Sequence, residues 1–294
     1  MVPVPLRAGF HQADAPRRAA GDGGVKLGLA LSGGAARGLA HVGVIGVLER
    51  EGIQVDMLAG TSMGAIVGAA YARGASAAEL KAYALDLTWP KLVRLFDFNP
   101  FKTSGLSGTR RIRDKLKEII GDLDFSELKR PFACVATDLI SGEEVVFTRG
   151  RVLDAVLASM SLPLVFRVPR LGRRYLVDGG LCDPLPVGPA RRLGADRVLA
   201  VNVLKNLGIL PPRRAASKRR VPPNMFRVAE QVIYIASAHL AEAGARDADA
   251  VIEPDMTGIH LEDFGLAGEA IARGEKAAEN YLAQLVSKTA AEKA

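Results

Sequence analysis

Short apolar runs and helix-like segments alternate along the first part of the chain. Residues 25–31 are mostly apolar and of strand length, and residues 54–59 repeat that pattern, which is typical of strands buried in a parallel sheet. A segment rich in small residues follows each run, over 36–50 and from Gly64 to about Gly74, and its closing glycine marks a helix end. This succession predicts right-handed βαβ units and therefore an α/β fold.

The rest of the chain continues in the same manner, and it contains no internal repeat. Further strands are expected at residues 132–137, 144–147, 175–177, 197–203 and 250–252. Further helices are expected at residues 76–87, 109–120, 152–159, 225–243 and 267–286. The order predicts a three-layer α/β/α fold, in which helices cover both faces of a central, mostly parallel sheet.

The N-terminal segment departs from this pattern. It is rich in Pro, Gly, Ala and Arg, and it lacks the compact apolar stretch of a secretory signal peptide. We therefore expect a flexible tail at residues 1–24 and a single domain over residues 25–290. Charges, prolines or glycines interrupt every long apolar stretch, so no transmembrane helix is expected.

The chain is basic, with a formal net charge of +7 over 294 residues and a pI near 9.5. Part of the positive charge lies in three clusters, at Arg17-Arg18, at Arg110 to Arg113 and over residues 213–220. A basic surface suits nucleic acid, anionic lipid or simple solubility. Because no aromatic-interleaved basic motif and no zinc-ligand spacing occurs, we expect no nucleic-acid partner.

The cysteine content bears on the compartment. Only Cys134 and Cys182 are present, so one disulfide is arithmetically allowed, but Cys134 lies in an apolar, strand-like run and is better interpreted as a buried thiol. The sequence therefore favours the reducing cytoplasm. The basic charge adds the expectation of peripheral contact with an anionic membrane surface.

A first chemical signal is the pentapeptide from Gly60 to Gly64, with Ser62 at its centre. A nucleophilic serine projects from a sharp turn between a strand and a helix, and flanking glycines let the backbone crowd there without a Cβ clash. The motif also directs the N-terminus of the following helix at the serine, where an oxyanion would form. A plain strand-to-helix turn is the alternative interpretation.

A second signal is the glycine-rich turn from Ser32 to Gly38, again between a strand and a helix. Backbone N–H groups in such a turn can bind an anion. The spacing also approaches a dinucleotide-binding fingerprint, with Ala35 at the middle glycine. That alternative requires an acid at the end of the second strand, and the chain has Gly60-Thr61-Ser62 there instead.

A third signal is Asp178-Gly179-Gly180, which follows the strand-like Tyr175 to Val177. An acid at a strand end, followed by two glycines, is well placed for a cleft. The same three residues could equally form a type I′ hairpin turn.

In this order the three motifs resemble the patatin-like phospholipase family. The segments ARGLAHVGVI, CVATDLISGE and ASMSLPLVF, with VDGGLCDPLPV, extend the resemblance over residues 27–203. It implies a patatin-like fold and hydrolysis of a lipid ester through an acyl-serine intermediate, without a cofactor. The sequence does not choose among phospholipid, lysophospholipid and other lipid esters, and it does not predict an oligomeric state.

The resemblance also assigns roles to individual residues. Ser62 is the implied nucleophile and Asp178 the implied base, in a dyad without histidine. The amides of Gly33, Gly34 and Ala35 would form the oxyanion hole, which Arg37 would help to hold. The motif residues that would support these groups are Gly38, Gly60, Gly64, Gly179 and Gly180. The family has a third glycine where this chain has Ala35, and a positive φ would be strained for alanine.

Elementary chemistry is compatible with a dyad, because an aspartate with a reference pKa near 4 is ionised at neutral pH. A dyad predicts that activity falls at acidic pH in a range below that in which histidine titrates. His239 or His260 could instead complete a Ser-His-Asp triad. His41 falls mid-helix among apolar residues and is interpreted as a core residue, and Asp138 as a turn cap rather than a cleft residue. No cluster with metal-ligand spacing occurs in the sequence.

The segment 87–108 combines aromatic residues with Lys91, Arg94 and Lys102. Such a mixture suits either a lid packed over the cleft or contact with a lipid surface. Its aromatic and aliphatic residues are Trp89, Leu92, Leu95, Phe96, Phe98 and Phe101. A function of another class, a non-catalytic lipid-binding or regulatory protein on the same fold, is the alternative to the hydrolase.

Overall fold

The computed structural model describes residues 24–86, 106–163, 166, 168–205 and 225–291. Several sequence expectations lie outside these residues. They are the tail at 1–23 with Arg17-Arg18, the basic run 213–220, and the aromatic segment up to residue 105. Everything below concerns the described part of the chain.

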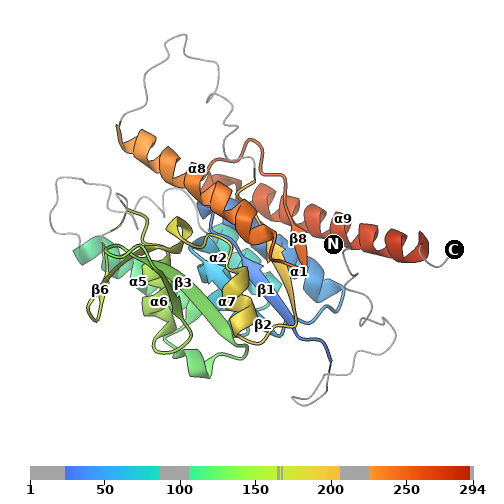
Figure 1. Ribbon diagram of the computed structural model, residues 1–294, viewed down its shortest axis with the longest axis horizontal. Coiled ribbons are helices and arrows are strands. Elements are labelled where there is room, and N and C mark those ends of the chain that lie inside the picture. Colours follow the sequence, from blue (N-terminus) through green and yellow to red (C-terminus); the bar gives the residue numbers. More distant parts are fainter. Residues whose placement is uncertain (1–23, 87–105, 164–165, 167, 206–224, 292–294) are drawn as a thin grey trace, which may run out of the picture.

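A single sheet runs through the fold in the order β5-β6-β3-β2-β1-β7-β8, with β4 added on β3 (Figure 1). The strands are β1 (Leu27–Leu31), β2 (Met57–Thr61), β3 (Phe132–Asp138), β4 (Glu144–Phe147), β5 (Arg170–Leu171), β6 (Arg174–Asp178), β7 (Arg197–Val201) and β8 (Ala250–Ile252). The neighbouring strands β3, β2, β1, β7 and β8 are all parallel, whereas β4, β5 and β6 pair in antiparallel fashion. The expected central, mostly parallel sheet is therefore confirmed.

Strand β3 lies where the parallel part of the sheet meets the antiparallel part. One edge of β3 pairs with β4. The other edge is divided, because β2 pairs with its first half as far as Thr61 opposite Val135, and β6 pairs with its last half from Asp178 opposite Ala136. Since Val135 and Ala136 are consecutive, the C-terminal ends of β2 and β6 meet along this edge.

Helices cover both faces of the sheet. They are α1 (Ala40–Arg50), α2 (Met63–Ala72), α3 (Ala77–Asp86), α5 (Leu106–Ile120), α6 (Val152–Ser159), α7 (Val187–Arg192), α8 (Met225–Ala245) and α9 (Ala267–Ala291). Short 3-10 helices are η2 (Ala35–Leu39), η3 (Phe125–Glu127), η4 (Gly179–Leu181) and η5 (Phe264–Leu266). None of the helices in these residues combines the length and hydrophobicity needed to cross a bilayer.

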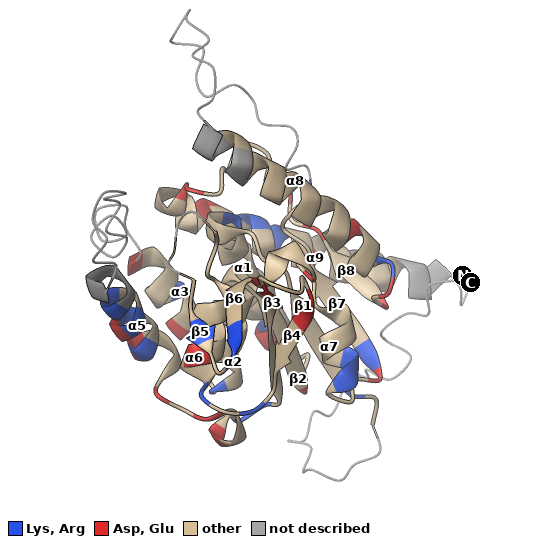
Figure 2. Ribbon diagram, turned by 60° about the vertical axis from the view of Figure 1, so that its left-hand side comes forward, with Lys and Arg blue, Asp and Glu red and all other residues tan. Residues whose placement is uncertain are grey.

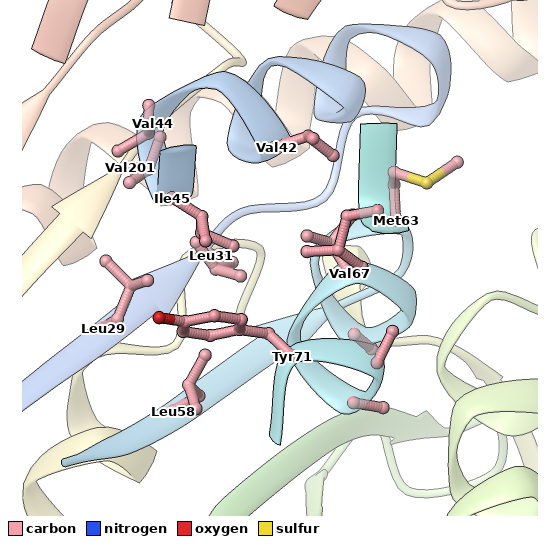
Figure 3. Packing of buried hydrophobic residues seen from close by; sticks show 14 of the residues in the cluster. Leu29, Leu31, Val42, Val44, Ile45, Leu58, Met63, Val67, Tyr71 and Val201 are labelled. Atoms are coloured by element: carbon pink, nitrogen blue, oxygen red, sulfur yellow. The ribbon is translucent and has the colours of Figure 1, made fainter. Parts of the chain in front are cut away.

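Residue size differs between the two faces of the sheet. Large side chains such as Leu29, Leu31 and Leu58 point to one face, where they pack with residues of α1, α2 and α9. Figure 3 shows Tyr71 of α2 lying among these leucines. Alanines such as Ala30 point to the other face, where α7 and α8 pack closely. The alternation follows from the period of two in a strand, and the three layers follow from both faces being apolar.

The expected elements agree with the structure in type, and three differences have physical reasons. The second strand ends at Thr61 rather than at residue 59, because Gly60 and Thr61 pair with β3 before the chain turns. Helix α7 was not expected, since its six residues are short and contain a proline. The two residues of β5 are too few to leave a pattern. Cys134 is buried and Cys182 partly buried, both as free thiols.

Candidate active site

Ser62 lies at a sharp turn between β2 and α2. Its backbone has φ 54° and ψ −118°, a conformation that L-residues adopt only where the surroundings impose it. The flanking glycines allow this crowding: a Cβ on Gly60 would lie 2.4 Å from the carbonyl oxygen of Gly64, and one on Gly64 would lie 2.2 Å from that of Leu31. The turn thus holds the Ser62 hydroxyl beyond the strand end.

Asp178 is the hydrogen-bond partner of that hydroxyl. Ser62 Oγ donates to Asp178 Oδ2 over 2.7 Å, across 116 residues of sequence. The contact follows from the divided edge of β3, which brings the ends of β2 and β6 together. The second carboxylate oxygen, Oδ1, accepts the amide of Gly180 at 2.8 Å. Both carboxylate oxygens are therefore oriented by fixed donors.

The electrostatics of Asp178 differ from those of an exposed aspartate. Burial raises the pKa of its carboxyl to about 6, although the hydrogen bonds from Ser62 and Gly180 lower it in part. At neutral pH the group is mostly ionised, and its pKa lies close enough to neutrality for it to take up a proton. An acidic limb near pH 6 overlaps the histidine range, so the expectation of a limb below that range does not fit this site.

The glycine-rich turn lies directly beside Ser62. A Cβ on Gly33 would lie 3.4 Å from the Cβ of Ser62. Gly34 has φ 140° and Ala35 has φ 45°, so the positive φ considered for Ala35 is present. Gly33 donates its amide to Pro184 O at 2.9 Å. The amides of Gly34 and Ala35 have no protein acceptor within the described residues.

Two buried polar side chains hold this turn from behind. Arg37 donates from Nε to Ile259 O at 2.8 Å, and its pKa is lowered to about 10, chiefly by burial and also by Arg273, which leaves it charged at neutral pH. His41 lies in the core, with Nε2 2.8 Å from Ser32 O, and burial lowers its pKa to about 4. It is therefore neutral and donates to that carbonyl.

We call the sharp turn from Gly60 to Gly64 the elbow, and Ser159, which the sequence pattern did not single out, holds it in place. Its Oγ accepts the amide of Ser62 at 2.8 Å, and the nearby Ser161 O accepts the amide of Asp178 at 3.0 Å. The segment ASMSLPLVF contributed to the family resemblance and was the available signal. Because a backbone amide carries no sequence information, the partner of Ser159 could not be inferred from the pattern.

The other candidates lie elsewhere. The His239 side chain is 75% exposed on α8 with Glu242 as its neighbour, and His260 is held through its backbone amide by Asp263.

Asp138 Oδ1 accepts the amide of Ile140 at 3.0 Å, so it caps the turn. Asp178-Gly179-Gly180 leads into η4 rather than into a hairpin. The described ranges contain no group of three or more His, Cys, Asp or Glu side chains placed to hold a metal.

Comparison with known proteins gives one family. A profile described as patatin-like phospholipase matches residues 29–191. An uncharacterised NTE family protein of Mycobacterium tuberculosis is 37% identical over 191 residues, which are 65% of this chain and 52% of that protein. A lysophospholipase, NTE1, of Pyricularia oryzae is 28% identical over 96% of this chain and 20% of its own. The chain thus spans about half, or less, of these curated relatives.

Solved structures were also found. VipD of Legionella pneumophila superposes with a TM-score of 0.48 and 12% identity, over 90% of this chain and 67% of its own. ExoU, in its complex with SpcU from Pseudomonas aeruginosa, superposes with a TM-score of 0.46 and 17% identity, over 90% of this chain and 52% of its own.

Proposed function

The chain belongs to the patatin-like phospholipase family, and from that premise we propose that it is a serine acyl hydrolase that cleaves lipid esters with Ser62 and Asp178. The observation that carries the proposal is the direct 2.7 Å hydrogen bond between Ser62 Oγ and Asp178 Oδ2. A nucleophile within hydrogen-bond reach of a base that is itself oriented by a third group is the arrangement of covalent catalysis. The third group here is the Gly180 amide.

The proposed reaction has two halves. Ser62 Oγ attacks the ester carbonyl carbon while its proton passes to Asp178 Oδ2, and collapse of the tetrahedral intermediate releases the alcohol, which receives that proton. Water then attacks the acyl-serine ester, Asp178 accepts the water proton, and the fatty acid leaves as Ser62 recovers its hydrogen. Besides the ester and water, both halves use only groups of this chain, so no metal or other cofactor is part of the proposal.

The oxyanion is the second charge that the site must stabilise. The amides of Gly34 and Ala35 lie in the turn beside Ser62 and have no protein acceptor within the described residues. We assign the oxyanion to these two amides, because Gly33, the third member expected from the sequence, donates to Pro184 O. Donors fixed in advance stabilise a developing oxyanion without reorganisation during the reaction.

Family membership supports a lipid ester as the substrate class, and a relative carries the name lysophospholipase. A phospholipid, a lysophospholipid or a related ester is therefore the proposed substrate, met at an anionic membrane surface. The proposed compartment is the cytoplasm, with two free thiols and a basic chain in support. A single domain over 25–290 behind a tail at 1–24 stays a prediction.

The test is an ester panel of varied chain length and headgroup, run on the wild type and on Ser62→Ala. We expect Ser62→Ala to lose hydrolysis by several orders of magnitude, as nucleophile removal does in serine hydrolases, and to lose fluorophosphonate labelling. Ser161→Ala is the matched control, because it removes a buried hydroxyl that donates to Leu157 O rather than to the dyad. Hydrolysis that survives in Ser62→Ala would contradict the assignment.

A non-catalytic lipid-binding protein is the alternative of another class. It predicts that wild type and Ser62→Ala behave alike, with lipid binding but with neither turnover nor labelling. The oriented carboxylate argues against it, because a buried, ionised aspartate costs folding free energy that a binding protein has no reason to retain.

A further inference from the structure

Exposed apolar side chains gather at the turn between β3 and β4. Ile140 is 79% exposed, the largest fraction among the big hydrophobic residues described, and Leu139 is 49% exposed. Tyr175 at the start of β6 is 44% exposed, and its backbone carbonyl accepts the Leu139 amide at 2.8 Å. We call Leu139, Ile140 and Tyr175 the turn tip. Single exposed apolar residues need no explanation, whereas a group of them on adjoining backbone segments is a candidate interaction surface.

The turn tip is held in place by its own backbone. Asp138 Oδ1 accepts the amide of Ile140 at 3.0 Å, and the Gly142 amide donates to Asp138 O at 2.8 Å. The turn therefore presents Ile140 outward in a fixed conformation. A protruding group that is already ordered loses little conformational entropy when it enters an apolar medium.

Cations surround the turn tip. The β5–β6 hairpin carries Arg170, Arg173 and Arg174, and no acid lies between them (Figure 2). Arg170 lies over the Tyr175 ring, with 5.7 Å from Cζ to the ring centroid. The β3–β4 connection contributes three carboxylates: Asp138, which is 3.7 Å from Arg174, the exposed Glu143, and Glu144, which pairs with Arg192 of α7. Four arginines, with Arg192 included, against three carboxylates leave a net charge of +1.

A second apolar group lies at the same edge of the sheet. Val228, Val232 and Ile235 are exposed at a spacing that places them along one side of α8. Helix α8 leads into β8, which is parallel to β7, so α8 begins at the carboxyl edge of the sheet. Its midpoint lies at the site, because Ser237 Oγ donates to Gly180 O at 2.7 Å. Figure 1 shows its N-terminal half extending beyond the sheet.

The turn tip is also near the dyad. Tyr175 precedes Asp178 by three residues of β6, which is about 10 Å at the rise of a strand. A surface touching the turn tip thus lies within about a lipid chain's reach of Ser62, whereas the opposite edge of the sheet lies a strand length further away. Apolar groups flanked by arginines match the interior and the headgroups of an anionic bilayer.

We propose that the turn tip, its three arginines and the exposed side of α8 form one surface that docks on an anionic lipid bilayer. The inference rests on the proposed function, because it identifies the face on which the hydrolase meets its substrate. Ile140 and Leu139 enter the interface, the arginines meet lipid phosphates, and the dyad faces the bilayer from the same edge.

The test measures binding of the Ser62→Ala protein to vesicles of phosphatidylcholine with and without phosphatidylglycerol, by co-sedimentation. Leu139→Ser/Ile140→Ser should weaken binding to both kinds of vesicle by at least about tenfold. Arg170→Gln/Arg173→Gln should weaken binding to phosphatidylglycerol vesicles by about thirtyfold, at about fivefold for each cation near an anionic surface. Ile140→Trp should strengthen binding, because indole favours the membrane interface.

Matched controls come from the opposite edge of the sheet. Val25 is 48% exposed just before β1, so Val25→Ser removes a comparable apolar side chain there. Arg149 follows β4 and Arg246 follows α8, and both are exposed, so Arg149→Gln/Arg246→Gln removes equal charge. Control variants that lose binding as strongly as the turn-tip variants would overturn the proposal.

A second measurement separates this inference from the proposed function. In the protein that retains Ser62, Leu139→Ser/Ile140→Ser should keep turnover of a soluble short-chain ester and lose turnover of vesicle lipid. Turnover of the soluble ester also reports correct folding. Unchanged vesicle binding in all turn-tip variants would overturn the surface, and a protein partner would then be the better occupant. Hydrolysis that survives Ser62→Ala would overturn the dyad and leave the binding result standing.

Discussion

The glycine-rich turn after β1 and the elbow after β2 are adjacent, and they are built alike. Each ends a parallel strand, each begins a helix, and each contains a non-glycine residue with positive φ, Ala35 at 45° and Ser62 at 54°. Within the described residues, Ala35 and Ser62 are the two non-glycine residues with a positive φ. Backbone strain in this protein is therefore concentrated around one point.

The two turns differ in how the strained residue is held and used. Ser62 is fixed by close packing of Gly60 and Gly64 and by the hydroxyl of Ser159, and its side chain is the group in contact with Asp178. Ala35 offers only its amide to the proposed reaction, so its methyl group has no part in it. Strain at Ser62 is thus inseparable from the proposed chemistry, while strain at Ala35 is removable.

The sharpest difference between the turns is Asp178, the proposed base, whose side chain accepts a hydrogen bond from Ser62 and not from the glycine-rich turn. Asp178→Asn should lower ester turnover by about 10²- to 10⁴-fold, the usual contribution of a general base. His239→Ala and His260→Ala are the controls and should retain most activity, measured as kcat/KM on one soluble ester. A folded histidine variant as inactive as Asp178→Asn would replace the dyad with a triad.

The pKa of Asp178 extends this prediction to pH. In the proposed mechanism turnover requires the ionised carboxylate, so kcat/KM should fall about tenfold per pH unit below pH 6. The folded-state pKa is raised, so the protonated form favours folding below about pH 4, and this contribution is lost as pH rises to 6. At neutral pH Asp178→Asn should therefore raise the free energy of unfolding by up to about 3 kcal/mol. Urea denaturation of the wild type and of Asp178→Asn, at pH 4 and at neutral pH, measures this difference in the free energy of unfolding.

Breaking the elbow itself is the next largest effect. In Gly64→Ala the new Cβ would lie 2.2 Å from Leu31 O, a backbone atom that cannot move aside cheaply. We expect a loss of about 3 kcal/mol or more in the free energy of unfolding, with loss of turnover. Gly46→Ala is the matched control: its new Cβ would meet only Ala77 at 3.6 Å, and it should stabilise α1 by up to about 1 kcal/mol. Equal stability of the two variants would contradict the packing argument.

Relaxing the glycine turn should have the smallest effect. Ala35→Gly removes strain of about 1–2 kcal/mol but adds freedom to the unfolded chain that offsets about 0.4–1 kcal/mol. We expect a net stabilisation of about 0.5 kcal/mol, read from the thermal midpoint, and turnover within twofold of the wild type. A clear loss of stability would mean that the methyl group contributes packing that outweighs the strain.

The sequence allowed the fold class and the family to be predicted, and both are confirmed. Ser62 and Asp178 could be nominated because each follows a strand at a glycine-marked turn, and their roles stay predictions. The pKa of Asp178 could not be anticipated, because burial depends on residues distant in sequence. The acceptor of the Gly33 amide and the Ser159 contact were equally hidden, since both involve backbone groups. The antiparallel course of β6, which delivers Asp178, leaves no local pattern.

The shared edge of β3 has a consequence for how the protein becomes active. The dyad forms only after β3 has accepted β2 on the first half of that edge and β6 on the second. A slip of one residue in either pairing would move its strand by about 3.3 Å and turn its side chains to the opposite face. Partly folded or misregistered chains therefore hold Ser62 away from Asp178. Under the proposed function, lipid hydrolysis therefore begins only once the sheet is complete.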